Sequence, residues 1–291
     1  MILYDEASGL YYEKIGDDRA SITDTDKKIT DITIPERIND ASVTEIRKKA
    51  FLGCKQLKSV GLPDAVEKVG DWAFAHCDAL KDIRIPRTCT FGQGVFKNDN
   101  SLTGIAVTGR SEASARLLAK AVTVMDAEYL LDAENAGSRE WFGRWDQKLE
   151  SILELADDDG YHLYVLCGEE DLHFDYEEYL EFNRRKKAGL CMLRLLYDEE
   201  LHEDLRERIT SYVTAHSVGR GSEASWKYIL SEHGDDIEYY RLLKETGGIG
   251  QDNLEMALNG LSDRHAQAKA FLINSFNTGN KTESFFDTLM L

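Results

Sequence analysis

The residues best suited to metal binding or catalysis gather in one stretch, YHLYVLCGEEDLHFD at 161–175. His162, Cys167, His173 and Asp175 all carry side chains that can ligate zinc. Zinc sites, however, use short and regular spacings, often with paired cysteines, and this stretch has neither feature. We therefore expect no metal ion and no cofactor here, and we interpret the stretch as a buried apolar segment with polar ends.

Acidic residues are frequent in and after this stretch, and two carboxylates at the right separation could act as a general acid and base. A basic cluster at 184–187 lies in the same expected helix, so pairing between neighbouring charges explains the acidic residues more simply. Serine, cysteine and histidine form no recognisable nucleophile signature in this sequence, and we expect no catalytic residue. The acidic residues are Glu169, Glu170, Asp171, Glu177 and Glu178.

Two of the five cysteines, Cys54 and Cys77, occupy equivalent positions in a repeated motif, Ala-Phe-x-x-Cys. Because equivalent positions of neighbouring repeats lie close together, this pair could form a disulfide or bind a metal ion. A free cysteine also packs well as a small apolar residue, and the cysteines are neither even in number nor clustered. We expect both side chains to be buried and unpaired.

The cysteine motif belongs to a longer repeat. Alternating apolar residues followed by proline recur at offsets of 28 and then 23 residues, and a last copy without proline follows after 22. The aromatic pair recurs in step, as Ala50-Phe51, Ala73-Phe74 and, with a change, Val95-Phe96. The equivalent apolar positions are Ile29, Ile32, Ile34 and Pro35; Leu57, Val60, Leu62 and Pro63; Leu80, Ile83, Ile85 and Pro86; and Leu102, Ile105 and Val107.

Each repeat predicts one coil of a solenoid. Alternation of apolar and polar residues is typical of a short strand with one buried face, and proline ends the strand because it cannot donate to a ladder. One coil cannot bury its own apolar face, whereas three or more stacked coils can. Phe51, Phe74 and Phe96 are expected to stack as a buried spine under the turns.

A family resemblance rests on ITDITIPERI and on VTEIRKKAFLGCKQLKSVGLPDAVEKVGDWAFAHCDALKDIRIP. Before them, GLYYEKIGDDRASIT reads as a β-hairpin that turns at Gly16-Asp17-Asp18. From about residue 9 to 108 the chain resembles the BspA-like class of bacterial leucine-rich repeats, which a hairpin of this kind commonly caps. The third unit departs from the pattern at Thr88, Cys89 and Thr90, as expected of a terminal coil whose sequence has diverged from the repeat. The resemblance implies a module without catalytic residues of its own.

After about Ser111 the apolar period changes from that of a strand to that of a helix. Ser111 is expected to cap the first helix, and Trp141, Trp145 and Leu149 recur at helical spacing in the next. The tail predicts two stacked helical hairpins, in the manner of ankyrin-like repeats. These hairpins are expected at 222–247 and 251–276, with helix starts at Gly234-Asp235 and Ser262-Asp263.

The expected fold is therefore α+β and multidomain. A short leucine-rich-repeat solenoid with a β-hairpin cap and short parallel strands occupies 1–109, and an acidic, all-α domain with helical-hairpin repeats occupies 110–291. The charge changes at the same place, from a net of -2 over the first range to -16 over the second.

The total net charge of -18 argues against nucleic-acid binding, because an acidic surface repels phosphates. The sequence contains no apolar run of 18 residues, so we expect no membrane span. MILYDEASGLYYEKIGDD lacks the basic and apolar regions of a signal peptide, which favours a cytoplasmic protein. A secreted or cell-surface location would need a leader upstream of Met1.

What remains for function is surface, because side chains between the buried strand positions should form an exposed face, and solenoids bind partners on such faces. Trp72 and His76 take variable positions of their repeat and are candidate exposed anchors, although Trp72 suits a packing role equally well. The candidate partner-binding residues of the strand face are Asp31, Thr33, Ser59, Gly61, Asp82 and Arg84, with Gly104 and Ala106 continuing it.

These features predict a non-catalytic protein–protein interaction or scaffold protein that binds a partner protein. The sequence specifies neither that partner nor the oligomeric state. One alternative is a cell-surface adhesin of the BspA-like class. The other is an enzyme with an unrecognised site in the helical domain, supported only by the histidines and carboxylates of 161–178.

Overall fold

The computed structural model of the protein describes residues 1–162 and 175–287. The chain folds into two compact units, Met1–Lys148 and Leu149–Leu291. The first unit contains the predicted solenoid and the second contains helices, which confirms the expected fold class. Within the described ranges, no helix has both the length and the apolar character needed to cross a membrane.

The first unit begins with an antiparallel hairpin that leads into the solenoid. Strand β2 turns at Gly16, where φ is +68°, and pairs with β3, which then pairs in parallel with β6. The predicted cap is therefore present and joins the sheet of the coils. This sheet runs in the order β1-β2-β3-β6-β8-β10, with β5 beside β6. Its strands are β1 (Ile2–Asp5), β2 (Leu10–Ile15), β3 (Arg19–Thr25), β5 (Arg37–Ile38), β6 (Ala41–Ile46), β8 (Lys68–Val69) and β10 (Thr90–Phe91).

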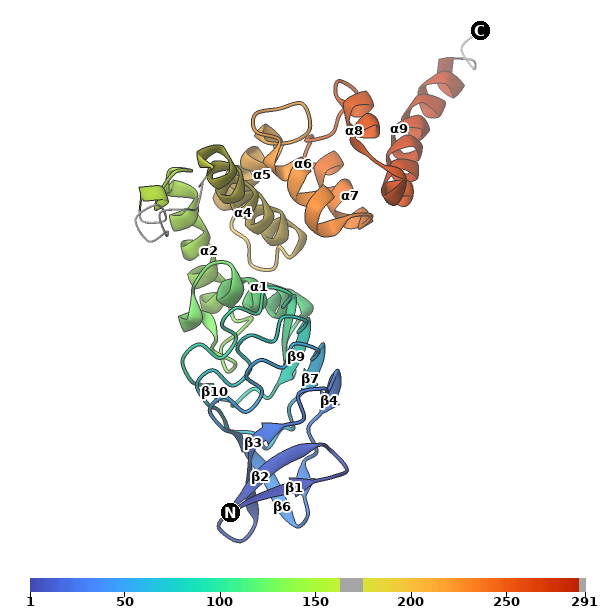
Figure 1. Ribbon diagram of the computed structural model, residues 1–291. Coiled ribbons are helices and arrows are strands. Elements are labelled where there is room, and N and C mark those ends of the chain that lie inside the picture. Colours follow the sequence, from blue (N-terminus) through green and yellow to red (C-terminus); the bar gives the residue numbers. More distant parts are fainter. Residues whose placement is uncertain (163–174, 288–291) are drawn as a thin grey trace. The chain divides into compact units, whose positions relative to one another are not determined.

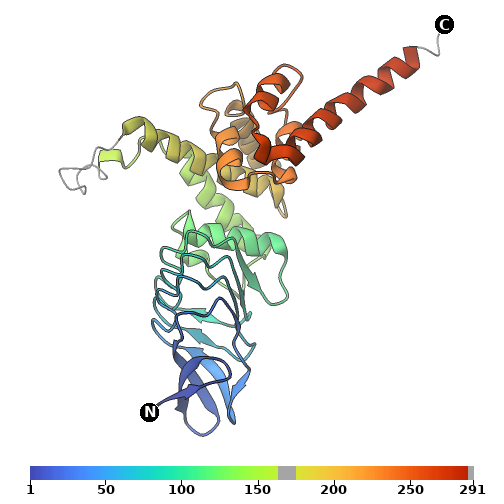
Figure 2. The same cartoon turned by 45° about the vertical axis from the view of Figure 1, so that its right-hand side comes forward.

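A second, all-parallel sheet runs along the solenoid in the order β11-β9-β7-β4, one strand from each coil. Figures 1 and 2 show the coils stacked in sequence order, with β4, β7 and β9 side by side. Each coil therefore contributes one rung to this sheet. The strands are β4 (Asp31–Thr33), β7 (Ser59–Gly61), β9 (Asp82–Ile85) and β11 (Gly104–Val107).

The core of the solenoid repeats from coil to coil. Phe51 and Phe74 stack with ring centroids 4.9 Å apart, and Phe74 and Phe96 stack at 5.9 Å. This is the predicted spine, and each offset pair contributes about 1 kcal/mol beyond the area it buries. The other predicted core positions of the second coil, Val60, Leu62 and Cys77, are also buried, and Val66 and Val69 are buried with them.

Helices close the first unit after β11. Helix α1 (Glu112–Thr123) packs against β11, so it lies against the last rung of the second sheet. Its cap is the predicted one, since the Ser111 hydroxyl accepts from Ser114 N. A short 3-10 helix, η1 (Glu128–Leu130), and α2 (Arg139–Glu154) follow. Two fully buried tryptophans of α2 join it to the preceding helices. Trp141 Nε1 donates to Leu130 O of η1, and Trp145 Nε1 donates to Leu117 O of α1.

The second unit is helical. A partly buried ion-pair cluster holds its first long helix, where Asp157 accepts from Arg184 (2.7 Å) and from the buried Lys187 (2.9 Å). Gly189 permits close packing, because a Cβ there would lie 2.5 Å from the Tyr228 ring. The helices are α4 (Tyr176–Leu196), α5 (Glu203–Ala215), α6 (Ala224–Tyr228), the π-helix η2 (Ile229–His233), α7 (Ile237–Glu245), α8 (Leu254–Gly260), the 3-10 helix η3 (Asp263–His265) and α9 (Ala266–Asp287).

The two predicted hairpins correspond to α6–α7 and α8–α9, with two differences. Asp236, not Asp235, caps α7, and Asp235 instead accepts from the N–H groups of Gln267 and Ala268 at the start of α9. Helix α9 also continues beyond residue 276. The expected helix start at Asp235 was therefore wrong by one residue, because that carboxylate accepts hydrogen bonds from the neighbouring hairpin.

Candidate interaction surface

The exposed face of β4, β7 and β9 places the candidate strand residues in two parallel rows. The register aligns Asp31 with Ser59, and Ser59 with Asp82. It likewise aligns Thr33 with Gly61, and Gly61 with Arg84. Parallel pairing repeats every side chain at the same height on the next coil, so both rows run along the solenoid axis. Gly104 and Ala106 of β11 continue the rows, with Gly104 buried and Ala106 exposed.

Hydrogen bonds within the first row fix the direction of its carboxylates. The Ser59 hydroxyl donates to Asp31 Oδ1 (2.6 Å), and this bond is the main reason that the pKa of the Asp31 carboxyl is lowered. Asp82 Oδ1 lies 3.6 Å from Arg116 Nη1 of α1. In the second row, Arg84 lies 3.4 Å from Asp64. These exposed ion pairs are each worth less than about 1 kcal/mol, so the charges remain available to a partner.

Small residues keep the middle of the face flat. Gly61 lies in the second row, and a Cβ added there would meet the Thr33 side chain at 3.4 Å, an ordinary contact. At Gly104, by contrast, an added Cβ would lie 2.5 Å from Asp82 Oδ1. A partner backbone can therefore approach β7 closely, while the neighbouring strands β4 and β9 present charged side chains.

Trp72 and His76 lie on a different edge, in the Ala-Phe-x-x-Cys turn. Both are exposed, Trp72 by 37%, and both have a φ of +59°. The equivalent residues also have positive φ, and glycine occupies the position of Trp72 in the next coil and that of His76 in the preceding one, at Gly94 and Gly53. These two glycines were the sequence signal for a left-handed turn, which the repeat comparison had not used. The strained backbone directs both side chains outward.

The cysteines of the described residues are buried, and Cys54 and Cys77 interact with each other, which lowers the pKa of the Cys54 thiol. Cys54, Cys77, Cys89 and Cys191 are free and buried, as expected for the first two. The interaction with Cys54 and burial both raise the pKa of the Cys77 thiol, and its Sγ donates to Phe51 O (3.2 Å). A protonated, buried thiol is a poor nucleophile and a poor metal ligand.

Most of the histidine and cysteine segment lies outside the described residues. Cys167, His173 and the acidic residues at 169–171 belong to that part, while His162 is exposed and Asp175 caps α4. Over 1–162 and 175–287, the structure brings together no group of three or more histidine, cysteine or acidic side chains that could hold a metal ion.

In the described part of α4, the basic cluster pairs with acidic residues other than those of the predicted run. Glu181 lies 3.8 Å from Arg185 and 3.1 Å from Lys227. Arg184 and Lys187 pair with Asp157 instead, from outside the helix. Hydrogen bonds from these two cations outweigh burial and keep the pKa of Asp157 below its ordinary value.

Sequence reasoning missed a cavity at the last coil. It lies between residues 91–100 and 122–131 and contains the carboxylates of Asp99 and Glu128. Asp99 replaces the cysteine found at the same position of the two preceding coils, a departure visible in the repeat.

Residues 24–115 match the family described as BspA type leucine rich repeat region, in six copies. The solenoid is a BspA-type leucine-rich repeat region. The match confirms the resemblance first seen in the repeated prolines, phenylalanines and cysteines. Repeats of this class support a protein-interaction or surface role in general. No curated protein matches the chain.

Several solved leucine-rich repeat structures resemble part of the chain. A leucine rich cell surface protein from Faecalibacterium prausnitzii is 28% identical, covering 37% of this chain and 32% of that one, with a TM-score of 0.34. A leucine-rich repeat protein from Bacteroides ovatus is 23% identical, covering 33% and 27%, with a TM-score of 0.31. The leucine rich repeat protein of T. pallidum is 30% identical, covering 35% and 59%, with a TM-score of 0.28. The chain thus spans about a third or less of the first two proteins.

Proposed function

We propose that this chain is a non-catalytic interaction protein that binds a partner protein through the exposed face of β4, β7 and β9. The observation that carries the proposal is the pair of in-register rows on that face, Asp31–Ser59–Asp82 and Thr33–Gly61–Arg84. Rows of equivalent side chains on stacked coils form an extended, regular surface, which solenoids use for binding.

The composition of the face indicates the kind of partner. Its hydroxyl, glycine and charged groups lack the tryptophan, tyrosine and buried arginine that dominate tight interfaces. Both signs of charge are present, since Asp31 and Asp82 accompany Arg84. We infer a partner with a flat, polar surface of mixed charge, bound reversibly. Trp72 and His76 are proposed as additional contacts on the turn edge.

A matched pair of variants tests this proposal. Thr33 is exposed at the β4 end of the second row, so Thr33→Arg places a long side chain on the face without disturbing the core. Thr90→Arg introduces the same exposed side chain on β10, in the other sheet, and serves as the control.

The measurement is affinity capture from the native host, followed by mass spectrometry. A partner of the strand face is recovered with the wild type and with Thr90→Arg and is lost with Thr33→Arg. Recovery of the same proteins with all three chains would refute the proposed surface.

A cell-surface role is the second candidate, favoured by the BspA-type repeats at 24–115. The same strand face would then contact a ligand outside the cell. Labelling intact cells with an antibody against the solenoid tests this candidate, with permeabilised cells as the control. Signal only after permeabilisation would contradict it.

A further inference from the structure

The coils of the solenoid are joined by a ladder of hydrogen bonds along the Ala-Phe-x-x-Cys turns. In each turn, alternate N–H groups point toward the next coil and donate to its carbonyls. The ladder adds a third line of backbone pairing to the two sheets. Its bonds are Lys49 N to Asp71 O (3.0 Å), Phe51 N to Ala73 O (2.7 Å), Gly53 N to Ala75 O (2.9 Å), Trp72 N to Gln93 O (3.0 Å), Phe74 N to Val95 O (3.0 Å) and His76 N to Lys97 O (2.9 Å).

The last turn presents the same donors, but no further coil follows it. The equivalent N–H groups belong to Gly94, Phe96 and Asn98. Gly94 N donates to a side chain, Glu128 Oε2, at 3.3 Å. Among the described residues, no group accepts from Phe96 N or Asn98 N. Phe96 is only 4% exposed, and a buried amide without an acceptor costs about 1–3 kcal/mol.

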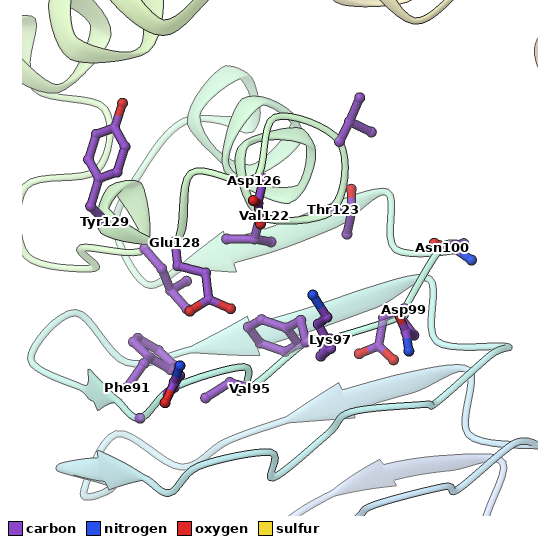
Figure 3. Close-up of a pocket in the computed structure, with 16 residues that line it drawn as sticks. Phe91, Val95, Lys97, Asp99, Asn100, Val122, Thr123, Asp126, Glu128 and Tyr129 are labelled. Atoms are coloured by element: carbon purple, nitrogen blue, oxygen red, sulfur yellow. The ribbon is translucent and has the colours of Figure 1, made fainter. Parts of the chain in front are cut away.

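The space that a next coil would occupy here is a cavity of about 390 Å³. The last turn forms its floor, and residues 122–131, which comprise the end of α1 and the segment after it, form its roof (Figure 3). Val95, Phe96 and Val122 line its apolar part. Its size falls within the range of ligand pockets, ~300–1,000 Å³.

The charges around the cavity select the kind of acceptor. Asp126 and Glu128 contribute two carboxylates against one cation, Lys97, and Asp99 adds a third carboxyl group, which burial keeps largely protonated at neutral pH because it raises the pKa to about 8. Asp99 Oδ1 accepts from Cys77 N, while the buried Oδ2 has no partner in the described part of the chain. Free N–H groups would attract an anion, but these carboxylates oppose one. A neutral carbonyl oxygen can accept from the N–H groups, and a positive charge beside it is attracted by the carboxylates.

We propose that this cavity binds an extended peptide segment of a partner protein that carries a basic side chain. Its main-chain carbonyls accept from Phe96 N and Asn98 N, and its basic side chain lies beside Glu128 and Asp126. The two donors are two residues apart, as are the carbonyls that the equivalent donors of the preceding coils bond, for example Ala73 O and Ala75 O. The bound segment adds one rung to the ladder, a form of strand addition. This site is separate from the face of β4, β7 and β9.

Nuclear magnetic resonance of the full-length, ¹⁵N-labelled protein tests the proposal. The probes are the blocked pentapeptides acetyl-Ala-Lys-Val-Lys-Ala-amide and acetyl-Ala-Glu-Val-Glu-Ala-amide, added to millimolar concentration. We expect the lysine peptide to shift the amide signals of Phe96 and Asn98, while those of Phe74 and His76, already bonded to the next coil, stay in place. The lysine peptide should bind at least ~10-fold more tightly than the glutamate peptide.

A conservative variant separates charge from structure. Glu128→Gln retains an oxygen that accepts from Gly94 N but removes the negative charge, so we expect weaker binding of the lysine peptide by ~3- to 10-fold. Thr33→Arg, on the strand face, should bind the peptide as the wild type does. Loss of binding in Thr33→Arg would overturn the assignment to this cavity.

Three further results would overturn the proposal. The first is unchanged Phe96 and Asn98 signals with both peptides. The second is equal affinity for the lysine and glutamate peptides. The third is equal affinity for acetyl-lysine-amide, which lacks the extended chain and would show an amine site instead. None of these results bears on the strand-face proposal, which is tested by Thr33→Arg in the capture experiment.

Discussion

Replacing Asp99 by asparagine should stabilise the solenoid at neutral and alkaline pH. Asp99 is 1% exposed, and its Oδ1 accepts from Cys77 N at 2.8 Å. Its Oδ2 is buried without a hydrogen-bond partner among the described residues. Burial raises the pKa of this carboxyl to about 8. Asparagine has nearly the same shape and keeps an oxygen for Cys77 N, but it has no proton to lose.

The size of the effect follows from proton linkage. An unfolded aspartate has a pKa of ~3.9, so between about pH 4 and pH 8 the folded state holds a proton that the unfolded state has lost. Stability is greatest below pH 4 and falls by about 1.4 kcal/mol per pH unit, to a total of about 5 kcal/mol by pH 8. The asparagine NH₂ group lacks a partner, which costs about 1–3 kcal/mol at every pH. The variant should therefore gain about 2–4 kcal/mol over the wild type above pH 8, lose this advantage between about pH 5 and pH 6, and be about 1–3 kcal/mol less stable than the wild type near pH 4.

Native-state hydrogen exchange of the Phe74 and Cys77 amides, followed from pH 5 to pH 9, measures the local free energy of opening in both proteins. Asp82→Asn removes the same formal charge from an exposed side chain and is the control. The difference between Asp99→Asn and wild type should grow with pH, whereas the control should show no such trend. A difference that stays constant over this range would refute the reasoning, because it would mean that Asp99 is ionised throughout.

Three other substitutions test the packing of each unit. Gly70→Ala should destabilise the solenoid by more than about 2 kcal/mol, because the added Cβ would lie 2.5 Å from Lys48 N. A melting temperature within about 2 °C of the wild-type value would contradict this prediction. His76→Val should be about 1–2 kcal/mol less stable than His76→Gly, since a φ of +59° is sterically unfavourable for a β-branched residue but not for glycine. Equal stability of the two variants in urea denaturation would show that the backbone of this turn has changed its conformation. Asp157→Ala should destabilise the helical unit by about 3 kcal/mol, because it removes the carboxylate beside the buried Lys187 ammonium and leaves Leu155 O as its acceptor. Thermal denaturation followed by circular dichroism should show the loss of helix at a lower temperature than in the wild type.

The helices of the two units show where sequence patterns are less informative. Ser111 was correctly expected to cap α1, because its hydroxyl serves the residues that directly follow it. Asp235 was expected to start a helix, but its carboxylate accepts from Gln267 and Ala268, more than 30 positions away in sequence. Residues that bond locally can be assigned from the sequence, whereas those that bond across elements require the packed structure.

By itself, the sequence determined the coils. Val60, Leu62 and Phe74 could be assigned to the core because equivalent residues recur in each repeat, and the same positions on stacked coils meet the same surroundings. The tertiary structure alone decided what happens where the repetition stops. Phe96 N–H and Asp99 Oδ2 lack partners in the described chain because no further coil follows, and the partners of a coil are supplied by its neighbour.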